Sequence, residues 1–201
     1  MPASERSGVD RRKLIAESGV RIIARDGVRA LTHRAVDREA GIPQGSTSYY
    51  VPTRHALIDL IVSVLAERSI ADAEQAASRL DTATHGERRL DAATLARQIA
   101  ALIQTLSSRR DDMRARYALL LELEDDTALR ARLTEKSDVH VKLRHSAASA
   151  LAQAGVPDPK GRAEELFALT DSLVLQRLML GAVRPIEPIL AAYLRGILTG
   201  D

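Results

Sequence analysis

A short polar stretch near the N-terminus carries the residue types best suited to contacting another molecule. Residues 41–54 read GIPQGSTSYYVPTR, so one amide, three hydroxyls and two adjacent phenols fall within about two helical turns. A helix this short and polar buries little apolar surface, so packing alone does not explain its residues. Amides and hydroxyls bond to base edges, while phenols and arginine bond to phosphates. The stretch predicts a helix that enters the major groove of DNA.

The residues around this stretch indicate the elements that position it. Asp10 is suited to cap a first helix, which Gly27 ends, and Thr32 to cap a short second helix, which Gly41 ends. Pro43 suits the first turn of a third helix, where its missing N–H costs nothing. This order of long helix, glycine turn, short helix, short turn and short helix is the spacing of a helix-turn-helix.

Charge is distributed unevenly along the chain. Residues 1–55 hold ten Lys/Arg and six Asp/Glu, whereas the formal net charge of the whole chain is only +2. A basic N-terminal segment on a mildly acidic remainder fits a head that binds phosphates. Ordinary fluctuation of surface charge is the alternative explanation.

The composition favours an all-α fold of about nine helices. Aromatic residues are scarce, at one Phe and four Tyr, so aliphatic residues that favour helices must build the core. The chain has no cysteine, which excludes disulfides and Cys-based zinc sites. No signal peptide or plain membrane span is recognisable, so we expect a cytoplasmic protein with no membrane partner.

Capping residues and apolar stripes divide the chain into predicted segments. Residues 1–9 are polar and are expected to form a disordered tail, 10–55 a helix-turn-helix domain, and 56–201 a domain for ligand binding and dimerisation. Thr53 is the expected cap of the fourth helix. The helices predicted after residue 52 cover residues 53–80, 91–106, 111–124, 127–151, 158–180 and 185–198.

The last two predicted helices indicate a dimer interface. Apolar residues of the penultimate helix go most of the way round it, which is typical of a helix buried on two sides. One side would face its own core and the other a second copy, in a four-helix interface with two-fold symmetry. The residues expected there are Leu166, Leu169, Leu173, Leu178, Leu190, Tyr193, Leu194 and Ile197.

From about Leu14 to Leu60 the chain resembles the TetR family of bacterial transcriptional regulators. The resemblance rests on the apolar first helix and on Gly27, Thr32, Ala40-Gly41, Gly45, Tyr49-Tyr50, Thr53-Arg54 and Leu57. It implies a helical homodimer with an effector pocket in its bundle. It also implies repression at a palindromic operator in double-stranded DNA, which a small-molecule effector relieves.

The resemblance implies DNA contacts at Thr32, His33, Arg34, Pro43, Gln44, Gly45, Ser46, Ser48, Tyr49, Tyr50 and Arg54. Gln44 is the best candidate for reading a base, because an amide pairs with adenine through two hydrogen bonds. The alternative for one of the two tyrosines is a core position that closes the head. The chain departs from the family's common residues at Asp37, Thr47, Ser48 and Val51.

The residues expected to line the effector pocket are Met113, Arg116, Tyr117, Leu120, His140 and Phe167. The scarcity of aromatic residues favours an aliphatic or small polar effector. No cofactor, metal site or enzymatic activity is expected, because no nucleophile motif or phosphate-binding loop is present and His33 and Asp37 supply only two ligands. The rival hypothesis is a helical small-molecule-binding protein whose head no longer binds DNA.

Overall fold

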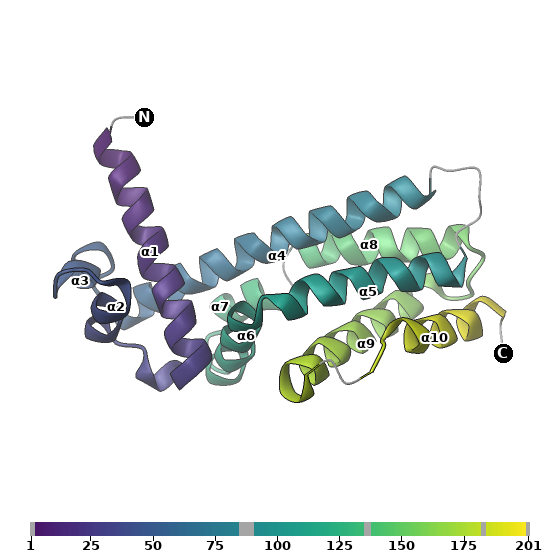
Figure 1. The fold of residues 1–201 in the computed structure, drawn as a ribbon. Helices are drawn as coiled ribbons and strands as arrows, with labels where there is room; N and C mark the ends of the chain where they lie inside the picture. The colour runs from purple at the N-terminus through teal and green to yellow at the C-terminus, as the bar shows by residue number, and fades with distance from the viewer. Residues whose placement is uncertain (1–2, 85–90, 135–137, 182–183, 200–201) are drawn as a thin grey trace. The chain divides into compact units, whose positions relative to one another are not determined.

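The computed structural model describes residues 3–84, 91–134, 138–181 and 184–199. Within these ranges the chain forms ten α-helices and one 3-10 helix, with no strand (Figure 1). The all-α prediction is therefore confirmed.

The helices follow one another as α1 (Ala3–Asp26), η1 (Val28–Ala30), α2 (His33–Ala40), α3 (Ser46–Tyr50), α4 (Arg54–Thr84), α5 (Ala92–Ser108), α6 (Arg110–Glu122), α7 (Thr127–Leu133), α8 (Asp138–Gln153), α9 (Pro159–Leu180) and α10 (Glu187–Thr199).

These helices form two compact units. The first unit consists of Met1–Ser69 and Arg110–Lys136, and the second of Ile70–Arg109 and Ser137–Asp201. The first unit is larger than the head predicted over residues 10–55, because the start of α4 and the helices α6 and α7 belong to it. A helix-turn-helix of one long and two short helices buries little by itself, so additional helices supply its core.

Side-chain caps are observed at four helix starts, among them the two predicted at Thr32 and Thr53. Each cap accepts a hydrogen bond from the backbone N–H three residues later, at 2.7–3.2 Å: Thr32 from Ala35, Thr53 from Ala56, Asp91 from Thr94 and Asp158 from Gly161. These groups would otherwise lack a partner in the first turn. Gly27 and Gly41 follow α1 and α2 with φ angles of 84° and 64°, which a residue with a β-carbon rarely adopts.

Two predicted boundaries were wrong. α1 begins at Ala3, so Asp10 lies inside the helix instead of capping it, and the helix covers part of the segment predicted as a tail. Extending a packed helix requires no new nucleation, which explains the earlier start. The helix predicted over residues 127–151 is divided into α7 and α8, because Thr134 leaves the helical region at φ −106° and ψ 178°. The cap of α7 is Asp126, which accepts from the N–H of Leu129.

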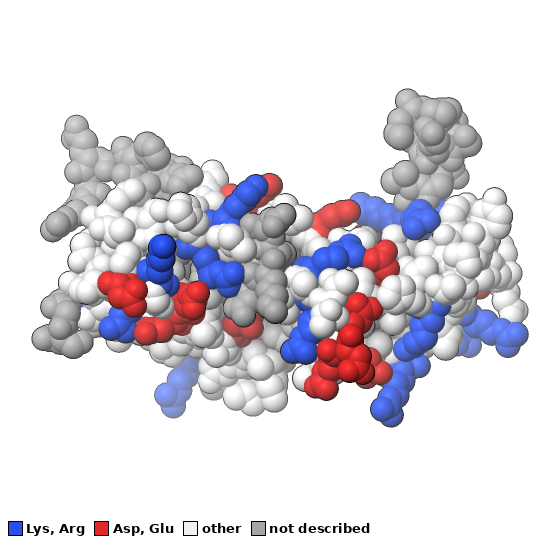
Figure 2. Space-filling model, turned by 180° about the vertical axis from the view of Figure 1, so that it is seen from behind, with Lys and Arg blue, Asp and Glu red and all other residues white. Residues whose placement is uncertain are grey.

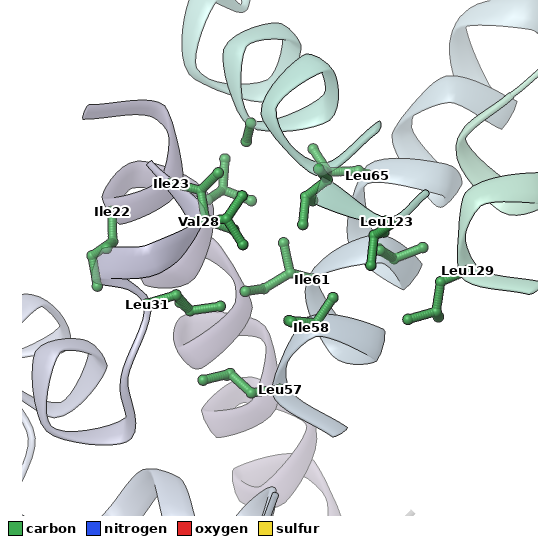
Figure 3. Packing of buried hydrophobic residues seen from close by; sticks show 14 of the residues in the cluster. Ile22, Ile23, Val28, Leu31, Leu57, Ile58, Ile61, Leu65, Leu123 and Leu129 are labelled. Carbon is green, nitrogen blue, oxygen red and sulfur yellow. The ribbon is translucent and has the colours of Figure 1, made fainter. Parts of the chain in front are cut away.

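The core of the first unit is aliphatic (Figure 3). Side chains of α1 and η1 meet those of α4, α6 and α7, and Leu31, Leu57 and Ile61 are completely buried. Each such side chain stabilises the fold by about 1.5–3 kcal/mol. Around this core, Arg68 of α4 pairs with Glu17 of α1 at 3.0 Å and Asp112 of α6 at 2.6 Å. The apolar packing and the ion pairs together stabilise the unit to which α2 and α3 belong.

In the second unit α5 packs against α9 and α10, and α8 packs against α9. Six of the residues predicted at a dimer interface are buried in this packing: Leu166, Leu173, Leu178, Leu190, Leu194 and Ile197. Only Leu169 and Tyr193 of that set are partly exposed. A helical apolar stripe does not reveal whether it faces its own chain or a partner, so the interface stays a prediction. The exposed apolar side chains of α9 and α10 are Leu175, Met179, Leu180 and Ile189.

Candidate nucleic-acid interface

The predicted recognition helix is shorter than expected and begins later. α3 contains only five residues, and Gly45 precedes it with a φ of 93°. Pro43 and Gln44 lie in the turn before α3, where the carbonyl of Pro43 accepts the N–H of Ser46 at 3.1 Å. The expectation that Pro43 opens the helix was wrong, because the left-handed backbone at Gly45 separates the two.

The start of α3 is held by a carboxylate from α2. Asp37 accepts hydrogen bonds from the N–H of Gly45 at 2.7 Å, the N–H of Thr47 at 2.8 Å and the hydroxyl of Thr47 at 2.6 Å. Both side chains are buried, with exposed fractions of 3% for Asp37 and 0% for Thr47. Burial raises the pKa of the carboxyl, but the bonds from Thr47 and Gly45 favour its charged form, and its pKa lies below the ordinary value.

The end of α3 is held by two basic side chains. Arg12 of α1 donates to the carbonyl of Tyr50 at 3.1 Å, and Nε2 of His33 donates to the carbonyl of Val51 at 2.7 Å. These bonds satisfy carbonyls that a helix leaves without partners at its C-terminus. His33 therefore has a structural bond in addition to the phosphate contact that the resemblance implies.

Arg54 also has a structural role that the sequence did not indicate. Its Nη1 donates to the carbonyl of Leu31, and its Nη2 donates to the carbonyl of Val28 at 2.9 Å. The guanidinium thereby closes the turn η1 beneath α2. The resemblance implies a DNA contact for this cation, but backbone carbonyls already engage it.

The two tyrosines have different environments. The Tyr49 side chain is 81% exposed, whereas Tyr50 is half-buried and packs against the core of the first unit. Their rings meet edge to face, with centroids 5.1 Å apart and planes at 87°. Tyr50 thus supports Tyr49, which projects outward. The alternative of one core tyrosine and one surface tyrosine matches this geometry.

The outer face of α2, the turn and α3 is polar and exposed. Its exposed residues include Thr32, Arg34, Gln44, Ser48 and Tyr49, all of which were predicted to contact DNA. The hydroxyl of Ser48 donates to the carbonyl of Gly45 at 2.9 Å and keeps its lone pairs available. Amide, hydroxyl, phenol and guanidinium groups on one small surface match the chemistry of base edges and phosphates.

Charged side chains of both signs cover the face of the molecule that lies behind the view of Figure 1. Figure 2 shows basic and acidic side chains intermixed on the surface that it presents. Mixed signs of this kind are typical of a solvated protein surface.

A cavity lies among α4, α5, α8 and α9 of the second unit. Its volume is about 70 Å³, and its walls carry mainly leucine, isoleucine and alanine. Its charged and amide side chains are Asp72, Gln75, Arg79 and Gln98, none of which was predicted from the sequence. A polar residue on a long amphipathic helix gives no signal of this kind, because surface positions look the same.

Most of the predicted effector residues lie away from this cavity, and their role stays a prediction. Of that set only Phe167 lines the cavity. Met113, Arg116, Tyr117 and Leu120 belong to α6 in the first unit, where Met113 is buried and Leu120 packs against the core. His140 lies on α8 but does not line the cavity. The sequence located apolar helices without showing which of them leave a space between them.

Other site classes find no support among the residues that the structure describes. No group of three His, Cys, Asp or Glu side chains in the described ranges is arranged to hold a metal ion. None of the described helices combines the length and apolarity that crossing a membrane requires.

Comparison with known families identifies the chain. Residues 90–200, more than half of the chain, match the family model described as the tetracyclin repressor-like C-terminal domain. The chain belongs to the TetR family. Its members are DNA-binding regulators and not enzymes. Because the matched residues lie outside the N-terminal stretch, an independent part of the sequence confirms the resemblance. A search of curated proteins found no match.

Solved structures share the TetR fold over nearly the whole chain. A protein of Mesorhizobium loti described as a TetR-family transcriptional regulator aligns with 96% of this chain and 95% of its own, at a TM-score of 0.70 and 16% identity. A TetR-family member from Streptomyces coelicolor aligns with 93% of this chain and 97% of its own, at 0.63 and 26%. A transcriptional regulator of Saccharomonospora viridis in complex with choline aligns with 96% of this chain and 97% of its own, at a TM-score of 0.65 and 19% identity.

Proposed function

We propose that this TetR-family protein is a homodimeric repressor that binds a palindromic operator in the bacterial cytoplasm and is released by a small molecule. The observation that carries the proposal is the polar outer face of α2 and α3, which is held at both ends by buried or capping side chains. A surface that is polar, exposed and rigid at once is suited to contacts of defined geometry.

The DNA contacts divide into two kinds. Arg34, Thr32 and the phenol of Tyr49 are suited to phosphates, which provide most of the affinity and make it dependent on salt. Gln44 stands in the turn ahead of α3 and is suited to a base edge. The departures from the family at Thr47 and Val51 are buried, and only the one at Ser48 lies on this outer face, which weakens the rival hypothesis of a head without DNA binding.

Dimerisation would present two such faces to one operator. Recognition helices in successive major grooves must lie about 34–36 Å apart, which requires two copies related by two-fold symmetry. The surface suited to pairing is the exposed apolar part of α9 and α10, made of Leu175, Met179, Leu180 and Ile189. Large apolar side chains that stay exposed on a single chain are typical of protein interfaces.

The cavity of the second unit is the proposed effector site. Its mainly apolar wall, with Gln75, Arg79 and Gln98 at intervals, suits a small molecule with an apolar body and one polar end. Structural relatives bind choline in one case and malachite green in another. Release requires that the ligand bind more tightly to the DNA-free arrangement than to the DNA-bound one.

Selection of duplexes from a random-sequence library by the wild-type protein tests the function directly. We expect enrichment of a palindrome whose half-site centres lie about 10 base pairs, or a multiple, apart. Repeating the selection with Gln44→Ala should relax the preference at one position of each half-site, with Gln153→Ala at the exposed end of α8 as the control. Absence of any enriched sequence would favour the rival, a ligand-binding protein that has lost DNA binding.

A further inference from the structure

We propose that Asp37 and Thr47 form a positioning pair that sets the geometry of DNA recognition although neither residue touches DNA. The inference rests on the proposed DNA-binding function. Both side chains are buried beneath the outer face, so no base or phosphate reaches them. Their effect on binding must therefore act through the position of α3.

The helix α3 is not stable by itself. Five residues are far too few for a stable isolated helix, and Gly45 at its start has no side chain that could cap it. Across its two ends, the N–H of Tyr49 donates to the carbonyl of Gly45 and the N–H of Val51 donates to the carbonyl of Thr47. The position of α3 therefore depends on groups outside the helix.

The carboxylate of Asp37 supplies the missing cap from another helix. Oδ2 accepts the N–H of Gly45, and Oδ1 accepts both the N–H and the hydroxyl of Thr47. Three bonds to one planar group define both the distance and the rotation of the turn and α3 relative to α2. Gln44, Ser48 and Tyr49 belong to that same short segment and move with it.

The charge of this group supports the same conclusion. A buried carboxylate loses its hydration, and it also lies under a surface that must accept phosphates of the same sign. A neutral apolar contact would avoid both costs. Because bonds to a charged acceptor are shorter and stronger than neutral ones, the pair fixes the geometry more firmly than packing would.

Two substitutions at one position separate positioning from packing. Thr47→Val keeps the volume of the side chain and removes the hydroxyl, whereas Thr47→Ser keeps the hydroxyl and removes a methyl group. Thermal unfolding first establishes that each variant is folded. Binding is then measured by fluorescence anisotropy, with a duplex selected from the random library by the wild-type protein and with an unrelated duplex of equal length.

We expect Thr47→Val to bind the selected duplex about tenfold or more weakly, the effect of losing one bond to a charged group. Its binding to the unrelated duplex and its salt dependence should stay within about twofold of wild type, because the phosphate-binding side chains remain. Thr47→Ser should stay within about threefold on both duplexes. A purely structural role would weaken both duplexes equally.

Equal affinity of Thr47→Val and wild type for the selected duplex would overturn the proposal, as would an equal loss on both duplexes. If the wild-type protein selects no duplex, the proposed function itself fails, which is a different result. If Thr47→Val does not fold, amide hydrogen exchange in the wild-type protein tests the pair instead. The amides of Gly45 and Thr47 must then be the slowest to exchange among residues 41–54, and fast exchange at both contradicts the pair.

Discussion

The residues that hold the recognition helix were hidden from sequence reasoning for a physical reason. A cap such as Thr32 bonds to an N–H three residues away, so spacing along the chain identifies it. Asp37 bonds to groups eight and ten residues away, across a turn whose path depends on Gly45. The one available signal was that Asp37 and Thr47 both depart from the family's common residues.

The pH dependence of stability tests the charge of Asp37. Its carboxyl has a pKa lowered by Thr47 and Gly45 against the opposing effect of burial, and the nearby charge of His33 lowers it further. A lowered pKa means that the stabilisation is complete at neutral pH and is lost as pH falls through that pKa. We expect Asp37→Asn to lower Tm by about 5 °C at pH 7. The difference in Tm between Asp37→Asn and the wild-type protein should become smaller below about pH 4. A difference in Tm that stays constant down to about pH 3 would contradict this.

Arg54 and Arg34 should separate a structural cation from a DNA-binding one. Arg54→Ala removes bonds to the carbonyls of Val28 and Leu31, so we expect a loss of about 1–3 kcal/mol in the free energy of unfolding in urea. Arg34→Ala, at an exposed position, should leave that free energy unchanged and weaken DNA binding at every sequence. If Arg34→Ala lowers the free energy of unfolding and Arg54→Ala only weakens DNA binding, Arg34 is the structural cation and Arg54 the DNA-binding one.

At the scale of elements, apolar spacing predicted most helices but not their neighbours. Leu173 and Leu190 have the periodicity of an interface, yet each is buried inside its own unit. The division of α7 from α8 was also missed, because apolar residues continue through it and the break depends on the extended backbone at Thr134. Partners in space follow from three-dimensional packing, which local patterns do not encode.

The crossing of α1 and α4 depends on one glycine. A β-carbon at Gly19 would overlap the buried side chain of Ile61, and its nearest approach is to Cδ1. We expect Gly19→Ala to destabilise the protein by about 1–3 kcal/mol in urea unfolding. In an Ile61→Ala background the same change should instead stabilise, because alanine favours the helix by roughly 1 kcal/mol over glycine. Stabilisation in the wild-type background would show that α1 and α4 approach less closely.

At the scale of the molecule, Met179 and Leu173 give opposite expectations. Met179 is 73% exposed on α9, so Met179→Glu should yield folded monomers by light scattering with unchanged helical circular dichroism. Leu173 is buried, so Leu173→Glu should instead unfold the chain. A dimer that survives Met179→Glu would place the interface on another surface.

The salt dependence of wild-type binding tests directly whether the protein recognises a DNA sequence. Affinity for the duplex selected by the protein is measured by fluorescence anisotropy from about 50 to 200 mM salt, beside an unrelated duplex of equal length. We expect binding at least about a thousandfold tighter to the selected duplex, with log affinity falling linearly and steeply against log salt. Equal affinity for both duplexes, or affinity that does not change with salt, would contradict it.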